Sequence, residues 1–290
     1  MSAEKLLTNT IDKLFNGATL MLINGIEATN IDALDRGLAY GDGLFSTLKV
    51  QYGYVQLWAL HLQRLQLGVQ KLSFPDLDWA QLSDEVQTVA RRLADKKVSV
   101  LKIIITRGRG GRGYSLQGCD APQRIISTGS YPDFYPQWQA QGIKLIQCEF
   151  QLSSNKQLAG LKTLNRLEQV LIKKELESKQ AVEGIVCDNQ GYVIEACSAN
   201  LFIYLDKQWK TPKLDSSGIA GVQRRQLMLR AAQAGISIVE EHIHVERLQQ
   251  AQAICLTNAL MGIVPVRQYQ QVVFDDQSLA RCKQLQLLIE

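Results

Sequence analysis

The sequence has no closely spaced cysteine pair, few histidines and no long apolar run. Its six cysteines form no CxxC pair and several lie inside apolar segments, which is typical of buried free thiols in a reducing compartment such as the cytoplasm. Three histidines are too few for a histidine-based metal site, and neither an HExxH motif nor an acidic calcium loop is present. No run of about 18 apolar residues occurs, so we expect no transmembrane helix.

What remains is an ordinary globular composition. The 290 residues include 32 Lys and Arg against 28 Asp and Glu, and the net charge of +4 is too small to indicate nucleic-acid binding by the whole chain. Hydrophobic residues make up 46% of the chain and charged residues 21%, which argues against disorder. The length predicts about two domains, and the composition favours a cytoplasmic enzyme without a metal or a membrane anchor.

The first 20 residues differ from the rest of the chain. They include Glu4 and Asp12 and lack the apolar core of a signal peptide. We interpret them either as an extension of unknown role or as the product of a start assigned upstream of the real one at Met21. Beyond them we expect a mixed α+β protein with a small domain at 21–130, an interdomain linker at 131–138 and a larger domain at 139–290.

Apolar periodicity and turn residues predict the elements. Asn24-Gly25 indicates a hairpin turn, and apolar runs indicate strands at 43–51, 98–107, 124–130 and 142–150. Helical spacing indicates helices at 59–72, from an N-cap at Asp78 to residue 93, and within 158–179, with Leu164, Leu167, Val170 and Leu171 inward. A helix between Gly221 and Gly235 should precede short strands and one small helix near 248–253.

The segment RGRGGRGY at 107–114 admits several interpretations. It resembles an RNA-binding RGG stretch, although such stretches usually lie in low-complexity surroundings and this one joins two apolar runs. A phosphate loop is disfavoured because no GK[ST] follows. A third interpretation is a loop whose Arg107, Arg109 and Arg112 bind a small carboxylated ligand, since guanidinium groups pair with carboxylates in a bidentate manner. A solvated loop is the remaining alternative.

Two charged residues lie in apolar surroundings. Lys162 follows Leu158, Ala159 and Leu161, and desolvation of an amine lowers its pKa and makes it a nucleophile for imine chemistry. Most lysines are simply solvated surface charges. Glu195 lies within a predicted strand among apolar or small neighbours, where it is either a strand-edge residue or the partner of a protonated heterocycle nitrogen.

Several residues could bind an anion. Gly218 and Gly221 precede a predicted helix, whose free amides and dipole favour negative charge. Asn258 at a strand end and Arg64 at the edge of a buried helical stripe could add donors, although a structural role for Arg64 is equally plausible. A lysine for an imine, a glutamate for a ring nitrogen, and amides with an arginine for a phosphate together describe a pyridoxal-phosphate site.

The same residues carry a resemblance to a known family. From about Met21 onward the chain resembles the fold-type-IV, branched-chain-aminotransferase-like pyridoxal-phosphate enzymes, and among them the aminodeoxychorismate lyase branch. The matching segments follow the family order and are DRGLAYGDGLFSTLKV, HLQRL, TRGRGGRGYS, AGLKTLNRLEQVLI, EACSANLF, GIAGVQR and TNALMGIVPV. After the lysine, transaminases of this family usually show Asn-Tyr, whereas this chain has Asn165-Arg166, as the lyase branch does.

The resemblance implies a role for each matched residue. Lys162 would form the Schiff base and act as the base in catalysis, and Glu195 would pair with the pyridine nitrogen. The other cofactor-binding positions would be Arg64, Arg166, Val222, Gln223 and Asn258. The substrate, 4-amino-4-deoxychorismate, would contact residues drawn from Tyr40, Arg107, Arg109, Arg112 and Tyr114.

The resemblance also implies the reaction and the assembly. The substrate would yield 4-aminobenzoate and pyruvate, a step of folate biosynthesis, and the enzyme would be a homodimer in which Tyr40 or loop 107–114 serves the partner's site. The nearest alternative is a transaminase of D-amino or branched-chain amino acids with the same cofactor and lysine. A more remote one is an RNA-binding module that uses RGRGGRG, which a steep salt dependence of RNA binding would reveal.

Overall fold

The computed structural model describes residues 20–289, so the predicted segment 1–20 lies outside the described residues apart from Leu20. The chain forms two compact units. The first comprises the described part of Met1–Gln56 with Phe74–Tyr131, and the second comprises Leu57–Ser73 with the described part of Pro132–Glu290. The boundaries expected from the sequence stay a prediction, and the units differ from them because residues 57–73 group with the C-terminal part of the chain.

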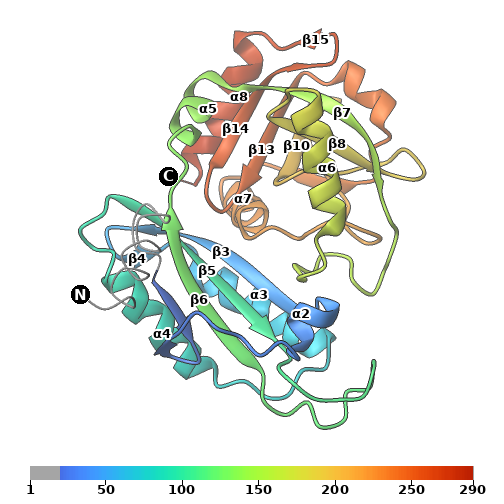
Figure 1. The fold of residues 1–290 in the computed structure, drawn as a ribbon. Helices are drawn as coiled ribbons and strands as arrows, with labels where there is room; N and C mark the ends of the chain where they lie inside the picture. The colour runs from blue at the N-terminus through green and yellow to red at the C-terminus, as the bar shows by residue number, and fades with distance from the viewer. Residues whose placement is uncertain (1–19, 290) are drawn as a thin grey trace. The chain divides into compact units, whose positions relative to one another are not determined.

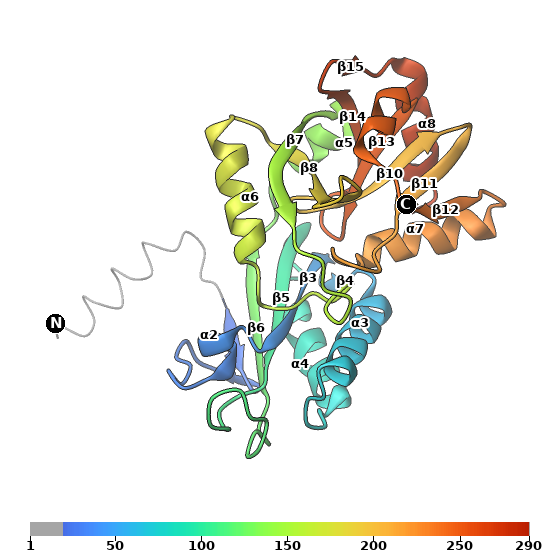
Figure 2. The same cartoon turned by 90° about the vertical axis from the view of Figure 1, so that its right-hand side faces the viewer.

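The first unit is built on an antiparallel six-stranded sheet with the strand order β2-β1-β6-β5-β3-β4. Its strands are β1 (Met21–Ile23), β2 (Ile26–Glu27), β3 (Gly43–Gln51), β4 (Tyr54–Val55), β5 (Val98–Thr106) and β6 (Gln123–Ser130). The short helix α2 (Arg36–Tyr40) precedes β3, and α4 (Trp79–Arg91) lies along one face of the sheet (Figure 2). The hairpin at Asn24-Gly25 and the helix cap at Asp78, which accepts from the Gln81 amide at 2.8 Å, are confirmed.

The second unit contains a nine-stranded mixed sheet with the order β12-β11-β10-β13-β14-β7-β8-β9, and β15 pairs with β14. The strands are β7 (Ile143–Leu152), β8 (Glu183–Asp188), β9 (Val193–Ala196), β10 (Asn200–Leu205), β11 (Gln208–Pro212), β12 (Ile238–Glu241), β13 (Ala253–Asn258), β14 (Gly262–Tyr269) and β15 (Val272–Val273). The helices are α3 (Trp58–Lys71), α5 (Tyr135–Gln141), α6 (Leu167–Ser178), α7 (Val222–Gln233) and α8 (Asp276–Leu287), with a 3₁₀ turn at Val245–Gln250.

Four helices of the second unit, α5, α6, α7 and α8, pack against this sheet, and α3 packs against α7 (Figure 1). Helix α6 connects the parallel strands β7 and β8, and α7 connects the parallel strands β11 and β12. Helix α8 packs on β13 and β14. The six cysteines are all free, and all except Cys197 are buried. No helix among residues 20–289 is both long and apolar enough to cross a membrane.

Helix α6 differs from its prediction. It begins at Leu167, and Leu167, Val170 and Leu171 have exposed fractions of 71%, 60% and 42%, whereas Ile172 and Leu176 are buried against the sheet. The prediction that Leu167, Val170 and Leu171 face inward is therefore wrong, and Leu164, which is half-buried, lies before the helix. The sequence offers two apolar faces on this helix, and the intramolecular core uses the other one.

The predicted linker at 131–138 stays a prediction, and it contains the first turn of α5, with Pro136 where a missing N–H costs nothing. One element near the C-terminus was predicted incorrectly. The C-terminal region was expected to contain only short strands and one small helix, yet α8 spans Asp276–Leu287 with Asp275 as its N-cap. Its buried residues Cys282 and Leu285 lie at helical spacing.

Candidate active site

Lys162 lies in the connection between β7 and α6, and this connection is hydrogen-bonded to the loop before α7. Gly160 has a φ of +79°, and its backbone pairs with Ile219 as an isolated parallel bridge. The amide of Gly160 donates to the carbonyl of Gly218 at 2.9 Å, and its carbonyl accepts from the amide of Ala220 at 3.1 Å. These bonds hold the half-buried Lys162 beside residues 218–220.

Glu195 is a buried carboxylate on β9 that the same loop holds in place. It is only 4% exposed, its Oε2 accepts from the Ile219 amide at 2.8 Å, and the Gln169 Nε2 lies 3.5 Å from its Oε1. Burial raises the pKa of Glu195 to about 7, although the Ile219 hydrogen bond and the positive charges of Lys162 and Arg166 act in the opposite direction. The site therefore contains a carboxylate that a further cation would stabilise.

The N-terminus of α7 is the third part of the site. Gly221 is the N-cap and no side chain caps the helix, so the first-turn amides of Val222 and Gln223 remain available to an anion. Asn200 fixes the backbone that leads into α7. Its Oδ1 accepts from the Gly221 amide at 3.1 Å, and its Nδ2 donates to the Ile219 carbonyl at 2.8 Å. A Cβ atom at Gly221 would lie 2.2 Å from the Asn200 Oδ1, so a larger residue here would displace the Asn200 side chain.

Helix α3 packs against α7 and contributes two basic side chains, His61 and Arg64. Desolvation lowers the pKa of Arg64 to about 10. The pKa of the fully buried His61 is well below its ordinary value, mainly through desolvation and also through the positive charges of Arg64 and Lys162. Both cations therefore lie within electrostatic range of one neutral imidazole, in the same unit as the α7 N-terminus.

Several buried polar atoms near the site have no hydrogen-bond partner among the described residues, and the Gln169 Oε1 is one of them. The Arg166 Nη2 donates to the Thr163 Oγ1 at 2.9 Å, but its Nε is buried and unpartnered. The same holds for the hydroxyl of Ser217, which precedes the loop that holds Glu195. Buried polar groups are normally satisfied, so these atoms indicate a site for a polar ligand. Together with Lys162, Glu195 and the uncapped helix, they fit a phosphorylated heterocycle.

The side chain of Asn258 is already engaged by the protein. Its Nδ2 donates to the Ser198 carbonyl at 3.1 Å, and its Oδ1 accepts from the amides of Leu260 and Met261 at 2.9 and 2.8 Å. The neighbouring Thr257 hydroxyl donates to the Gly262 carbonyl at 2.8 Å. A phosphate contact by Asn258 stays a prediction.

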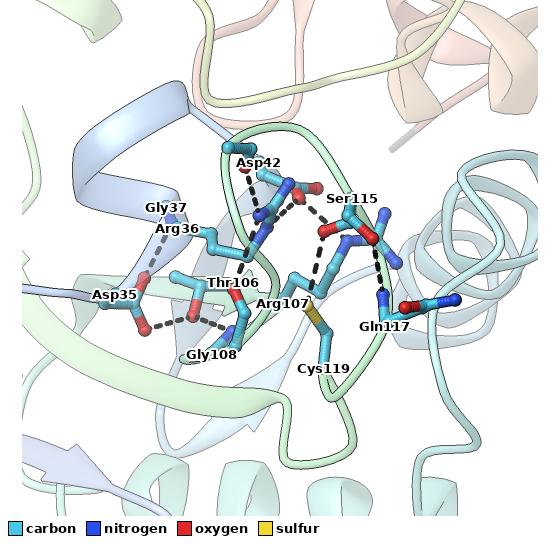
Figure 3. Close-up of polar contacts among 12 residues, drawn as sticks. Asp35, Arg36, Gly37, Asp42, Thr106, Arg107, Gly108, Ser115, Gln117 and Cys119 are labelled. Carbon is cyan, nitrogen blue, oxygen red and sulfur yellow. Dashed lines mark hydrogen bonds and ion pairs between the residues drawn. The ribbon is translucent and has the colours of Figure 1, made fainter.

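The predicted substrate residues belong to the first unit. Tyr40 ends α2, and its ring centroid lies 5.4 Å from that of Tyr114. Arg107 is buried, and its Nε donates to the Asp42 Oδ2 at 2.8 Å (Figure 3). Arg109 and Arg112 are exposed in the loop that follows. The predicted residues thus fall into two groups, with all cofactor positions in one compact unit and all substrate positions in the other.

Sequence reasoning missed three residues that this geometry includes. His61 lies one helical turn before Arg64, and its spacing was the available signal. Asn200 and Gln169 carried no local signal, because their partners Gly221 and Glu195 are 21 and 26 residues away in the chain. In the part of the chain that the structure describes, no group of three or more His, Cys, Asp and Glu side chains is arranged to hold a metal ion.

Comparison with known proteins agrees with this geometry. The model of the family "Amino-transferase class IV" matches residues 43–269. An aminodeoxychorismate lyase from Vibrio harveyi is 36% identical over 244 residues, which is 84% of this chain and 89% of the relative. The crystal structure of a 4-amino-4-deoxychorismate lyase from Pseudomonas aeruginosa has a TM-score of 0.86 and 38% identity, covering 92% of this chain and 98% of the other.

A more distant structure supports the fold alone. A hypothetical aminotransferase from Mycobacterium tuberculosis, in a PLP-bound form, has a TM-score of 0.82 at 21% identity and covers 94% of this chain and 97% of the other. The expected mixed α/β architecture of fold type IV is therefore confirmed.

Proposed function

Because the chain belongs to the class IV aminotransferase family, whose members depend on pyridoxal phosphate, we propose that it is a lyase that converts 4-amino-4-deoxychorismate to 4-aminobenzoate and pyruvate. The observation that carries the proposal is the hydrogen-bonded loop 218–221, which lies beside Lys162 and donates to the buried Glu195. The lyase relatives at 36% and 38% identity support the choice of reaction, and so does the Asn165-Arg166 pair that follows the lysine.

Each cofactor contact has a residue suited to it. Lys162 would hold the cofactor covalently through its amine, and Glu195 would keep the ring nitrogen protonated, because a buried carboxylate gains most from a cation placed next to it. The amides of Val222 and Gln223, with Arg64, would bind the phosphate. Arg166, whose Nε is buried without a partner, would lie beside the ring. When bound, pyridoxal phosphate supplies an electron sink for the substrate carbon next to the amine.

The residues of the chain then perform the proton chemistry. The free amine of Lys162 would take the proton from the substrate's ring carbon C4, which carries the amino group. The adjacent carbon–oxygen bond breaks, enolpyruvate leaves with the bonding electrons and takes up one proton to become pyruvate, and the ring becomes aromatic. Aromatisation makes the elimination strongly downhill, so the protein mainly orients the groups and keeps Lys162 within reach of C4.

We also propose that the enzyme is a homodimer. Leu167, Val170 and Leu171 expose apolar side chains on α6 in one unit, and Leu34 and Leu38 do so on or near α2 in the other. Clustered exposed apolar side chains mark protein interfaces, and a second copy of the chain is the occupant that the family implies. The six free cysteines support a reducing, cytoplasmic location.

Borohydride reduction tests the cofactor assignment. We expect the purified protein to absorb visible light through its bound cofactor, and reduction should fix the cofactor to the protein. Peptide mapping should then find the label on Lys162 alone. Label on another lysine would overturn the site, and a colourless protein that takes up no pyridoxal phosphate would overturn the enzyme proposal.

Product analysis separates the lyase from the transaminase. We expect equal amounts of pyruvate and 4-aminobenzoate from 4-amino-4-deoxychorismate, without any amino acceptor. The alternative enzyme would instead transfer the amino group of a D-amino or branched-chain amino acid to 2-oxoglutarate. Amino transfer without pyruvate release would contradict the proposed reaction while leaving the cofactor site intact.

A further inference from the structure

The arginine-rich segment forms a folded loop between β5 and β6. Gly108, Gly110, Gly111 and Gly113 all have positive φ values, between 58° and 136°. A Cβ atom at Gly108 would lie 2.1 Å from the Ala121 carbonyl oxygen, one at Gly110 2.1 Å from that of Gly118, and one at Gly111 2.0 Å from that of Ser115. Gly108, Gly110 and Gly111 are thus required by close backbone packing, in contrast to an open RGG stretch.

Arg36 holds this loop through hydrogen bonds to its backbone. Its Nη1 donates to the carbonyls of Gly110 and Gly113 at 3.4 and 2.9 Å, and its Nε donates to the Asp42 Oδ2 at 2.9 Å. The Arg36 side chain is almost fully buried. The two bonded carbonyls flank Arg112, so the backbone that carries Arg112 is held on both sides.

The three loop arginines differ in what they contact. Arg107 is buried, is paired with Asp42 at 2.8 Å, and stacks its guanidinium 4.1 Å from the centre of the Phe74 ring (Figure 3 shows the Asp42 pair). Arg109 is exposed and is paired with Asp32 at 3.2 Å. The guanidinium of Arg112 has no hydrogen bond or ion pair to any residue in the range 20–289. Two of the three positive charges are therefore matched by a carboxylate within the loop's own unit, and the third is not.

The loop that carries Arg112 also carries an exposed aromatic side chain. Tyr114, two residues after Arg112, is 85% exposed, and its ring contacts that of Tyr40 at 5.4 Å. Tyr40 in turn lies under the Arg36 guanidinium at 5.0 Å. The same arginine that fixes the loop thus also contacts the aromatic pair. An unpaired cationic fork on the same loop as an exposed aromatic ring suits a cyclic carboxylate better than a phosphate or an aliphatic ligand.

We propose that Arg112 is the loop arginine that binds a carboxylate of the substrate, and that Arg36 is the positioning residue that holds it in place. This inference rests on the proposed lyase function and deepens it. Arg107 then belongs to the framework of the loop, and Arg109 is neutralised by Asp32. A fixed backbone matters because a long side chain on a mobile loop would lose more conformational entropy on binding.

Substitution of Arg112 tests the proposal. We expect Arg112→Gln to raise KM for 4-amino-4-deoxychorismate by about 10- to 100-fold, the usual size of a lost charge-assisted hydrogen bond, with kcat changed much less. The increase in KM for Arg109→Gln should be at least five times smaller than the increase for Arg112→Gln. Arg92→Gln, a matched change of an exposed and ion-paired arginine on the same unit, is the control and should leave KM unchanged.

An inhibition measurement tests the role of Arg112 without relying on turnover of the substrate. Chorismate carries the same two carboxylates with a hydroxyl in place of the amine, so it serves as an unreactive dicarboxylate probe. Its inhibition constant should rise in Arg112→Gln by the same factor as KM, while the visible spectrum of the bound cofactor stays as in the wild type. A wild-type KM and inhibition constant in Arg112→Gln would overturn the proposal and leave Arg112 a solvated surface charge.

Arg36→Lys tests the positioning role. Lysine keeps the charge near Asp42 but cannot reach both carbonyls, so amide hydrogen exchange in residues 109–114 should accelerate and KM should rise with kcat nearly constant. If exchange accelerates without a change in KM, Arg36 serves the fold alone and the positioning role is overturned. If the wild-type enzyme releases no pyruvate from the substrate, the proposed function itself has failed, which is a different outcome from a wild-type KM in Arg112→Gln.

Discussion

Glu195 is the residue whose environment bears most directly on the proposed chemistry. Its carboxylate is buried, accepts one backbone hydrogen bond at 2.8 Å, and has a pKa raised to about 7. Such a group is unfavourable in the cofactor-free protein at neutral pH and becomes favourable when a protonated ring nitrogen lies against it. Binding of the proposed cofactor next to Glu195 would therefore relieve an unfavourable interaction in the cofactor-free protein.

Glu195 should make the stability of the cofactor-free protein depend on pH. Because the folded-state pKa of Glu195 lies above its ordinary value of 4.5, the folded protein binds more protons than the unfolded protein between pH 4.5 and 7. This contribution to stability is fully present below pH 4.5 and is lost as the pH rises through about 7, which amounts to roughly 3 kcal/mol. Glu195→Gln should remove that dependence.

Urea unfolding of the cofactor-free wild type and Glu195→Gln at pH 5 and pH 8 measures this pH dependence of stability. We expect Glu195→Gln to be more stable than the wild type at pH 8 and the difference to shrink toward pH 5. Equal differences at both pH values would show that Glu195 does not titrate in this range. With cofactor and substrate added, the same variant should lose about 100-fold or more in kcat, because the electron sink lacks its charged partner.

At the scale of elements, the loop before α7 connects several parts of the proposed cofactor site. Residues 218–221 bond to Gly160, to Glu195 and to Asn200, so one short segment joins the Lys162 connection, β9, β10 and the α7 N-terminus. Gly218 allows this path, since a Cβ atom there would lie 2.6 Å from the Ile194 side chain at a φ of +81°. The anion site is consequently a property of several elements and not of α7 alone.

The element-scale prediction follows from Asn200. Asn200→Ala removes the two hydrogen bonds that hold Ile219 and Gly221 and should weaken pyridoxal phosphate binding about fivefold to tenfold, since the helix N-terminus is no longer aligned on the phosphate. Pyridoxal, which lacks the phosphate, should bind nearly as well as to the wild type. Titration of the apoprotein by absorbance measures both constants.

A matched asparagine provides the control for this experiment. Asn189, which is exposed in the β8–β9 turn, can be changed to Ala in the same way and should leave both dissociation constants unaltered. An equal loss of affinity for pyridoxal and pyridoxal phosphate in Asn200→Ala would mean that the residue supports the whole pocket, and the specific link to the phosphate would be wrong.

At the scale of the whole molecule, the exposed apolar side chains of α6 predict a protein interface. Helix α6 buries Ile172 and Leu176 in its own unit and leaves Leu167, Val170 and Leu171 exposed directly after the Lys162 connection. In a monomer this exposed face would favour aggregation. We expect the wild-type protein to sediment as a dimer.

Val170→Glu tests this expectation. A charge placed in an apolar interface should shift the protein toward monomer, as measured by sedimentation or light scattering, without loss of the folded circular-dichroism signal. Leu229→Glu, at an exposed apolar position on α7, is the matched control and should remain dimeric. A monomeric wild-type protein, or dimers of unchanged stability in Val170→Glu, would contradict an interface at α6.

Much of the local structure could be predicted because its causes lie within a few residues. Asn24-Gly25 adopts positive φ values because those residue types tolerate them, and Asp78 caps α4 through an amide three residues away. Lys162 and Glu195 stood out because charged side chains were surrounded by apolar neighbours in the sequence. Their proximity in the fold could not be predicted from the residues alone, because it depends on the bridge between Gly160 and Ile219.

The sequence by itself therefore determined most of the elements, the Asn24-Gly25 turn and the chemical types of the proposed functional residues. Only the tertiary structure decided which of three similar arginines carries an unpaired charge, because their partners Asp32 and Asp42 lie more than 60 residues away. It also decided which apolar face of α6 enters the core. Both depend on long-range packing, since identical residue types acquire different roles according to which distant segments the sheet topology brings beside them.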